Sequence, residues 1–199
     1  MDTKEKFSEN VMLIDTEFLN GWVFKLRQVM SEALGRNLPD LDLVTWLTYL
    51  ALDAGVRGEG NEIQVVLLHN EGERALQGCV PANLDELDGQ ACRTALGEFT
   101  FFSTDPAGIA SREDMYMELM NFIQDAAEVK RLMLLPFCRK HGQAPEDTLW
   151  KFVNEKKGKV SEKVLYFAPE RLSETFPARW DWVGYSLMRA YNIKPGELE

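Results

Sequence analysis

Short runs of consecutive apolar residues recur along the chain, separated by stretches in which apolar residues stand three or four positions apart. The short runs predict five strands, over residues 11–15, 62–69, 98–103, 129–137 and 164–168. Four consecutive aliphatic residues, Val65 to Leu68, lie inside the second run. Such a run indicates a strand buried on both faces, as in a parallel sheet covered by helices.

The stretches with wider apolar spacing predict helices. Residues 18–34 have a broad apolar face at helical spacing, and Gly35 is placed to end that helix in a left-handed conformation. Asp40 is predicted to cap the next helix, which ends near Gly55. Further helices are predicted to begin at Ser111, to cover residues 147–155 and to begin near Asp181.

Strands that alternate with helices predict an α/β fold. We expect a three-layer sandwich around a mostly parallel sheet of about five strands, PIN/NYN-like or Rossmann-like, with right-handed crossovers. The chain of 199 residues is long enough for one core and short for two, so we predict a single domain over residues 1–199. Residues 75–97 show no regular pattern beyond a short helix near residues 84–87.

The order of strands and helices also predicts where a site would lie. In an open parallel sheet, ligands bind outside the carboxyl ends of the strands. Six residues at or after predicted strand ends are candidates for this crevice: Asp15, Glu17, Asn20, His69, Asp105 and Asp114. Asp15 leads because it ends the first strand, and carboxylates suit Mg²⁺ or Mn²⁺, which makes Asp15 and Asp114 candidate metal ligands.

Each candidate also has a structural explanation. Asp15 has an alternative role as a helix cap, and Asp114 stands three residues after Ser111, the spacing of a capping box. Glu17 lies near the start of a helix, where the helix dipole favours an acid whatever the function. His69, a lone histidine at a strand end, is typical of a hydrogen-bonded structural residue, although any histidine near neutral pKa can act as a base.

Charge and cysteine content restrict the class of protein. The net charge of −10, from 32 acidic and 22 basic residues, argues against a nucleic-acid partner. The densest basic cluster, Lys156, Lys157, Lys159 and Lys163, is expected to be a solvated helix end and loop. The sequence has three cysteines without metal-ligand spacing, no signal segment and no apolar run of about 20 residues. These features predict a cytoplasmic protein that does not span a membrane.

Four segments carry a resemblance to a known family: Ile14–Asn20, Leu52–Gly55, Leu96–Phe99 and Gly184–Met188. Over nearly its full length the chain resembles an uncharacterised family of Bacteroidales proteins of unknown function, a resemblance that implies no activity. The order of elements also resembles PIN/NYN-like nucleases, which implies Mg²⁺ or Mn²⁺ bound by Asp15 and Asp114. Residues 135–140, after the fourth strand, differ from that superfamily because they contain no acid.

Two functions therefore compete. The first is a non-catalytic α/β domain that binds a protein partner or a small ligand at the crevice, with no cofactor and no catalytic residue assigned. The aromatic segment from Trp180 to Trp182, predicted beside a helix start, suits an interface or pocket as well as a core. The alternative is a metal-dependent nuclease or phosphodiesterase that uses Asp15 and Asp114. A homo-oligomer would be unsurprising for the first function, since closed symmetric assemblies are common.

Overall fold

The computed structural model describes residues 6–138, 147–155, 159–194 and 196–198. Its described part contains a seven-stranded sheet in which six strands are parallel and one edge strand is antiparallel. The strands lie in the order β5 (Ala91–Thr94), β6 (Gly97–Thr104), β3 (Asn61–Leu68), β1 (Asn10–Asp15), β7 (Arg131–Leu134), β8 (Val164–Ala168) and β9 (Arg179–Trp182).

The order of the parallel strands defines where the sheet reverses direction. If only the six parallel strands are counted, from 1 to 6 along the chain, their order across the sheet is 3-2-1-4-5-6. This is the doubly wound order of Rossmann-like folds. β1 lies at the centre, hydrogen-bonded to β3 on one side and to β7 on the other. The switch point therefore lies between the carboxyl ends of β1 and β7.

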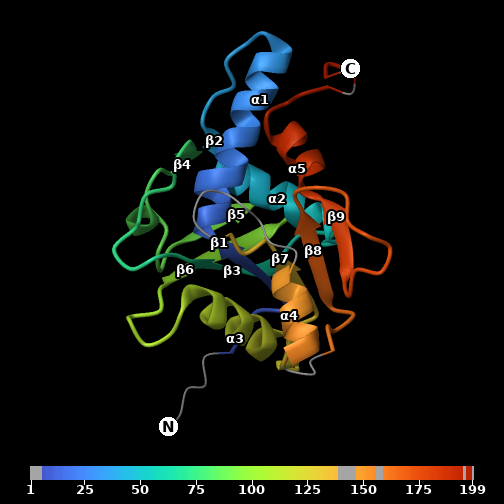
Figure 1. The fold of residues 1–199 in the computed structure, drawn as a ribbon. Helices are drawn as coiled ribbons and strands as arrows, with labels where there is room; N and C mark the ends of the chain where they lie inside the picture. The colour runs from blue at the N-terminus through green and yellow to red at the C-terminus, as the bar shows by residue number, and fades with distance from the viewer. Residues whose placement is uncertain (1–5, 139–146, 156–158, 195, 199) are drawn as a thin grey trace.

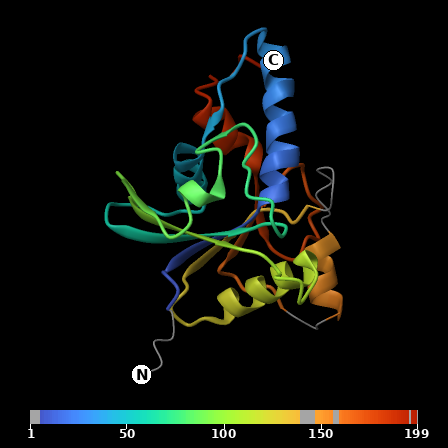
Figure 2. The ribbon, with the colours of Figure 1, turned by 90° about the vertical axis from the view of Figure 1, so that its left-hand side faces the viewer.

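Helices cover both faces of the sheet and make three layers (Figures 1 and 2). One face is covered by the π-helical segment η1 (Phe18–Val23) and by α1 (Phe24–Leu34), α2 (Leu43–Asp53) and α5 (Val183–Ala190). The other face is covered by α3 (Arg112–Asp125) and α4 (Asp147–Glu155). A smaller sheet, β2 (Leu41–Asp42) with β4 (Cys79–Val80), and the 3₁₀ turn η2 (Leu84–Glu86) contribute to the same core as α1, α2 and α5.

Side chains of β1 point alternately to the two faces of the sheet, and both faces are buried. Met12 and Ile14 belong to the core beneath α1, α2 and α5, whereas Val11 and Leu13 belong to the core beneath α3 and α4. Since all four side chains are fully buried, the run of aliphatic residues follows from a strand with a helical layer on each side. Asp15 continues the second set and points toward α3.

The predicted α/β fold and mostly parallel sheet are confirmed, and all five predicted strands are present. The strand count was too low, because the edge strands β5 and β9 were not predicted. The segment from Trp180 to Trp182 lies in β9, and the last helix begins at Val183, two residues after the predicted start near Asp181. The Trp182 indole nitrogen donates to the Pro169 carbonyl at 3.0 Å, which fixes this edge strand to the preceding loop.

Two helix ends provide a further test of the sequence pattern. Gly35 ends α1 with φ 61°, as predicted for a left-handed cap. The cap of α2 was predicted wrongly: Asp42, not Asp40, accepts from the Thr45 amide at 2.8 Å. Asp40 instead forms an ion pair with Arg27 on α1. Lys156 and Lys157 of the basic cluster lie outside the described residues.

Candidate functional site

Asp15 lies at the switch point, where it is fully buried and already has partners. Arg112, the first residue of α3, forms an ion pair with its Oδ1. The Cys138 amide donates to its Oδ2 at 2.6 Å, and Arg112 Nη2 donates to the Cys138 carbonyl at 2.6 Å. The guanidinium also lies over the Phe137 ring, 4.7 Å from its centroid. Arg112 therefore fills the crevice between β1 and β7.

Burial governs the protonation of Asp15. Desolvation raises the pKa of this carboxyl from 3.8 to about 6, although Arg112 and the Cys138 amide both act to lower it. Burial likewise raises the pKa of the Cys138 thiol, with the Asp15 charge as the second cause. Cys138 is accordingly a buried neutral thiol and not an activated nucleophile.

Glu17 and Asn20 line a groove on the β3 side of the switch point. The groove has a volume of about 710 Å³ and lies between η1 and the loop that follows β3. Its lining is mainly polar and consists of Glu17, Asn20, Gly21, Gly72, Glu73, Arg74, Ala75, Gln77, Asn83 and Asp85. Asn20 joins the two walls, because its amide donates to the Ala75 carbonyl at 2.9 Å and accepts from the Gln77 amide at 2.8 Å.

Hydrogen bonds within the groove hold its charged side chains in place. Asn70 donates to Glu17 at 3.1 Å and to Glu73 at 2.7 Å. Arg74 forms an ion pair with Asp85 and donates to the Ser103 hydroxyl at 3.1 Å. Three acids and one base line the groove, so its surface carries a net negative charge.

His69 and Asp105, two further candidates, lie beside each other after β3 and β6. The His69 Nε2 and Asp105 Oδ2 atoms are 3.9 Å apart, and His69 Nδ1 lies 2.7 Å from the Asn70 carbonyl. The imidazole is almost fully buried. His69 is not among the residues that line the groove, and its contact with the Asn70 carbonyl favours a role in holding this loop.

Asp114 lies at the start of α3. It is exposed and accepts from the Ser111 hydroxyl at 2.6 Å, while its amide donates to the same hydroxyl at 3.0 Å. The two bonds make the predicted capping pair. Within the described residues, no group of three or more His, Cys, Asp or Glu side chains is arranged to hold a metal ion.

The structure thus divides the six predicted residues among different surroundings. Glu17 and Asn20 share the groove, His69 pairs with Asp105, Asp15 pairs with Arg112, and Asp114 caps α3. Sequence reasoning missed Arg112, Arg74 and Asn70, and no motif around these residues signals their role. The junction after β1, residues 15–20, contains no glycine, whereas dinucleotide-binding folds need glycine there for the pyrophosphate to approach.

Comparison with known proteins assigns a family to the chain without an activity. A model described as a family of unknown function, DUF6621, matches residues 4–198. No curated protein and no solved structure matches. Among the described helices, none combines the length and apolar character needed to cross a membrane.

Proposed function

The chain belongs to DUF6621, whose function is unknown, and we propose that it is a non-catalytic α/β domain that binds a small, positively charged polar ligand in the groove between η1 and the loop after β3. The groove itself carries this proposal. It opens at the carboxyl edge of the sheet, where open α/β folds bind ligands, and it is lined by carboxylates and amide groups.

The backbone conformation of η1 also favours a binding site at this groove. η1 is a π-helical turn directly after the central strand, and it brings Asn20 and Gly21 to the groove. π-Helical turns are rare and occur frequently at functional sites. Glu17, Glu73 and Asp85 provide acceptors for a cationic group, and Arg74 provides a donor beside them.

The alternative, a metal-dependent nuclease, places its ion at Asp15. Both oxygens of that carboxylate have a donor in the structure, from Arg112 and from the Cys138 amide. A divalent ion therefore has to displace the guanidinium before it can bind. Ligation at Asp15 and Asp114 would in addition break the Ser111–Asp114 pair at the start of α3.

A titration followed by ¹H–¹⁵N NMR tests the proposal. Spermidine and arginine amide are the small-ligand probes, tetralysine is the peptide probe, and Mg²⁺ and Mn²⁺ are the metal probes. We expect saturable shifts at the amides of Gly72, Ala75 and Gln77 with a small amine. Glu73→Gln should weaken this binding, whereas Glu71→Gln, a neighbouring exposed acid outside the groove lining, should leave it unchanged.

Three outcomes contradict the proposal. The first is that no amine saturates these shifts, and the second is that both glutamate variants weaken binding equally. The third is a response confined to Asp15 and Cys138 upon addition of Mg²⁺ or Mn²⁺, together with cleavage of an oligonucleotide, which supports the nuclease. Saturation by tetralysine but not by the small amines identifies a protein segment as the ligand and rejects the small-ligand form.

A further inference from the structure

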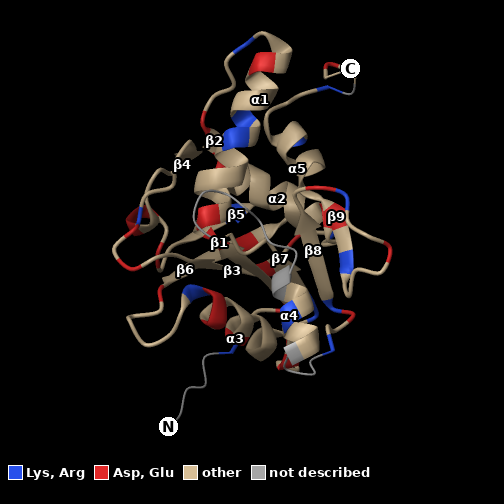
Figure 3. Cartoon of the chain, in the orientation of Figure 1, with Lys and Arg blue, Asp and Glu red and all other residues tan. Residues whose placement is uncertain are grey.

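A second pocket lies at the opposite edge of the sheet, where β7, β8 and β9 begin. It has a volume of about 280 Å³ and is lined by Ala54, Lys130, Arg131, Leu132, Met133, Glu162, Lys163, Leu165 and Arg179. Four of these residues are basic and one is acidic. Such an excess of positive charge is unexpected in a chain with a net charge of −10. Figure 3 shows basic positions at one end of β8 and of β9.

The strand register explains how these cations come together. Met133 on β7, Leu165 on β8 and Arg179 on β9 are register partners, so their side chains leave the same face of the sheet. Arg131 stands two residues before Met133 on β7 and shares that face. Lys163 directly precedes β8 and lies in the same pocket lining. Neighbouring strands lie about 4.8 Å apart, so the three cations come from the starts of three successive strands at one edge of the sheet. Ala54, at the end of α2, closes the pocket.

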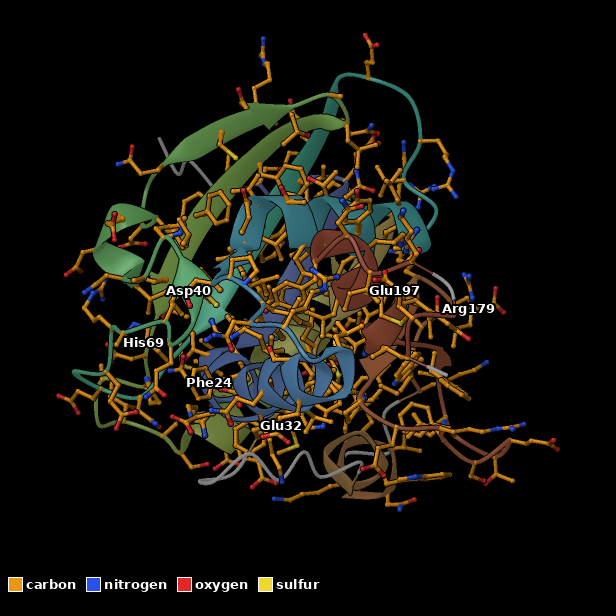
Figure 4. All side chains as sticks on the ribbon, turned by 90° about the horizontal axis from the view of Figure 1, so that it is seen from above. Phe24, Glu32, Asp40, His69, Arg179 and Glu197 are labelled. Atoms are coloured by element: carbon orange, nitrogen blue, oxygen red, sulfur yellow. The ribbon has the colours of Figure 1, made fainter. Side chains whose placement is uncertain are left out.

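The cations in the pocket retain free hydrogen-bond donors. Arg131 uses one guanidinium nitrogen on Asn10, at 3.2 Å, and Lys163 donates to the carbonyls of Gln124 and Ala126. In the described part of the chain, the Arg179 side chain has no hydrogen-bond or ion-pair partner. In the view from above, Arg179 lies at the outer edge of the molecule, far from His69 at the carboxyl edge (Figure 4).

Acidic residues neutralise only part of the positive charge in the lining of this pocket. Lys130 is neutralised by Glu9, with 2.6 Å between Nζ and Oε1. Glu162 is exposed and is the one acid in the lining, against Arg131, Lys163 and Arg179. Like charges that line one pocket repel one another, and an anion bound between them reduces the repulsion. Guanidinium groups suit oxyanions because their donors match two oxygens at once.

We propose that this edge of the sheet binds a small oxyanion with two negative charges, a phosphate group or a dicarboxylate, held by Arg131 and Arg179 with Lys163 behind them. The small volume fits such an ion better than a long chain, since a water molecule occupies about 30 Å³. The acidic remainder of the surface repels an extended polyanion such as nucleic acid. This site is independent of the groove between η1 and the loop after β3.

The test is an NMR titration of the full chain with inorganic phosphate and with succinate, at an ionic strength matched by NaCl. We expect one of them to give saturable shifts at the amides of Arg131, Lys163 and Arg179, and the tighter ligand identifies the class of oxyanion. Arg179→Gln should weaken binding about tenfold, the loss of one charge-assisted contact. It should not lower the thermal midpoint, because the side chain has no partner to lose among the described residues.

The matched control is Arg93→Gln, which removes the same charge from β5, where the Arg93 side chain is 82% exposed. It should bind the oxyanion as the wild type does. Equal weakening by both arginine variants overturns the proposal, because it indicates general attraction to a positive charge. The absence of saturation with both anions also overturns it. So does binding of a DNA oligonucleotide without binding of either small anion.

Discussion

The guanidinium of Arg112 closes over the carboxylate of Asp15, and the pair fills the position where an open α/β sheet offers its crevice. The Arg112 side chain is 9% exposed and the Asp15 side chain 0%, so water screens the pair little. Cys138 binds both members through its backbone. The pair thereby ties β1, α3 and the segment after β7 together at one point.

The first prediction concerns the stability that depends on this pair. At pH 7.5, Arg112→Met should lower the free energy of unfolding by about 3–5 kcal/mol, because it leaves the buried Asp15 charge without its cation. The double variant Asp15→Asn, Arg112→Met removes both charges and should recover part of the loss. Urea denaturation measures both values, with Arg93→Gln as the exposed control. A single variant as stable as the control would mean that the ion pair contributes nothing.

The second prediction is a pH dependence that arises from Asp15. Its pKa is raised in the folded protein, from 3.8 to about 6, chiefly by desolvation. A carboxyl with a raised folded pKa stabilises the fold fully below pH 3.8 and loses that contribution as the pH rises through 6. At 1.36 kcal/mol per unit, the loss is up to about 3 kcal/mol.

Asp15→Asn isolates this contribution because it leaves every other titrating group in place. The unfolding free energy of the wild type minus that of Asp15→Asn should fall as the pH rises from 4 to 7. Urea denaturation at a series of pH values measures this difference. A flat curve would show that Asp15 ionises at its ordinary pKa in the fold, and a curve that rises with pH would show that the fold lowers this pKa.

Much of the fold was predictable because a strand that is buried on both faces appears in the sequence as a run of consecutive aliphatic residues. β1 and β3 are buried from both sides, so their consecutive aliphatic residues identify them. β5 was missed because an edge strand needs no such run: Ala91 and Arg93 are exposed, and its antiparallel partner β6 determines its course. The cap of α2 is Asp42, the residue directly before the helix, and Asp40 pairs with Arg27 on α1.

The site was predictable in position but not in composition. Asp15 was recognisable because it ends an apolar strand. Its partner Arg112 is 97 residues away, at the start of a helix where Ser111 and Asp114 explain the local pattern by themselves. The groove could not be predicted from the sequence either, since Arg74 and Asn70 stand in a stretch without periodic apolar positions. Pairings between distant loops are determined by tertiary packing, which leaves no local pattern to detect.

The third prediction concerns the contact between α2 and α5. The indole nitrogen of Trp46 donates to the Ser186 hydroxyl at 2.9 Å, and both side chains are fully buried. Ser186→Ala should lower the free energy of unfolding by about 1–3 kcal/mol, because the indole N–H is left without an acceptor. Thermal and urea denaturation measure it. Ser173→Ala, an exposed serine, should cost a few tenths of a kcal/mol at most, and equal losses would contradict the role of burial.

The fourth prediction tests how the groove is held open. Asn20 connects η1 to the Ala75 carbonyl and to the Gln77 amide, so Asn20→Ala should free the loop after β3. We expect the Gln77 amide to exchange its hydrogen with solvent about tenfold faster or more, since the bond that protects it is gone. Hydrogen exchange followed by NMR measures this rate.

Asn121→Ala on the exposed face of α3 is the control for Asn20→Ala. The Asn121 side chain contacts Gln124, and Asn121 is distant in sequence from the loop after β3. Its Gln77 amide should exchange at the wild-type rate. In Asn20→Ala, the amine titration should also lose affinity, because the wall that carries Glu73 and Arg74 is no longer fixed. Unchanged exchange at Gln77 would show that the loop is held by its other contacts, Asn70 to Glu17 and Arg74 to Ser103.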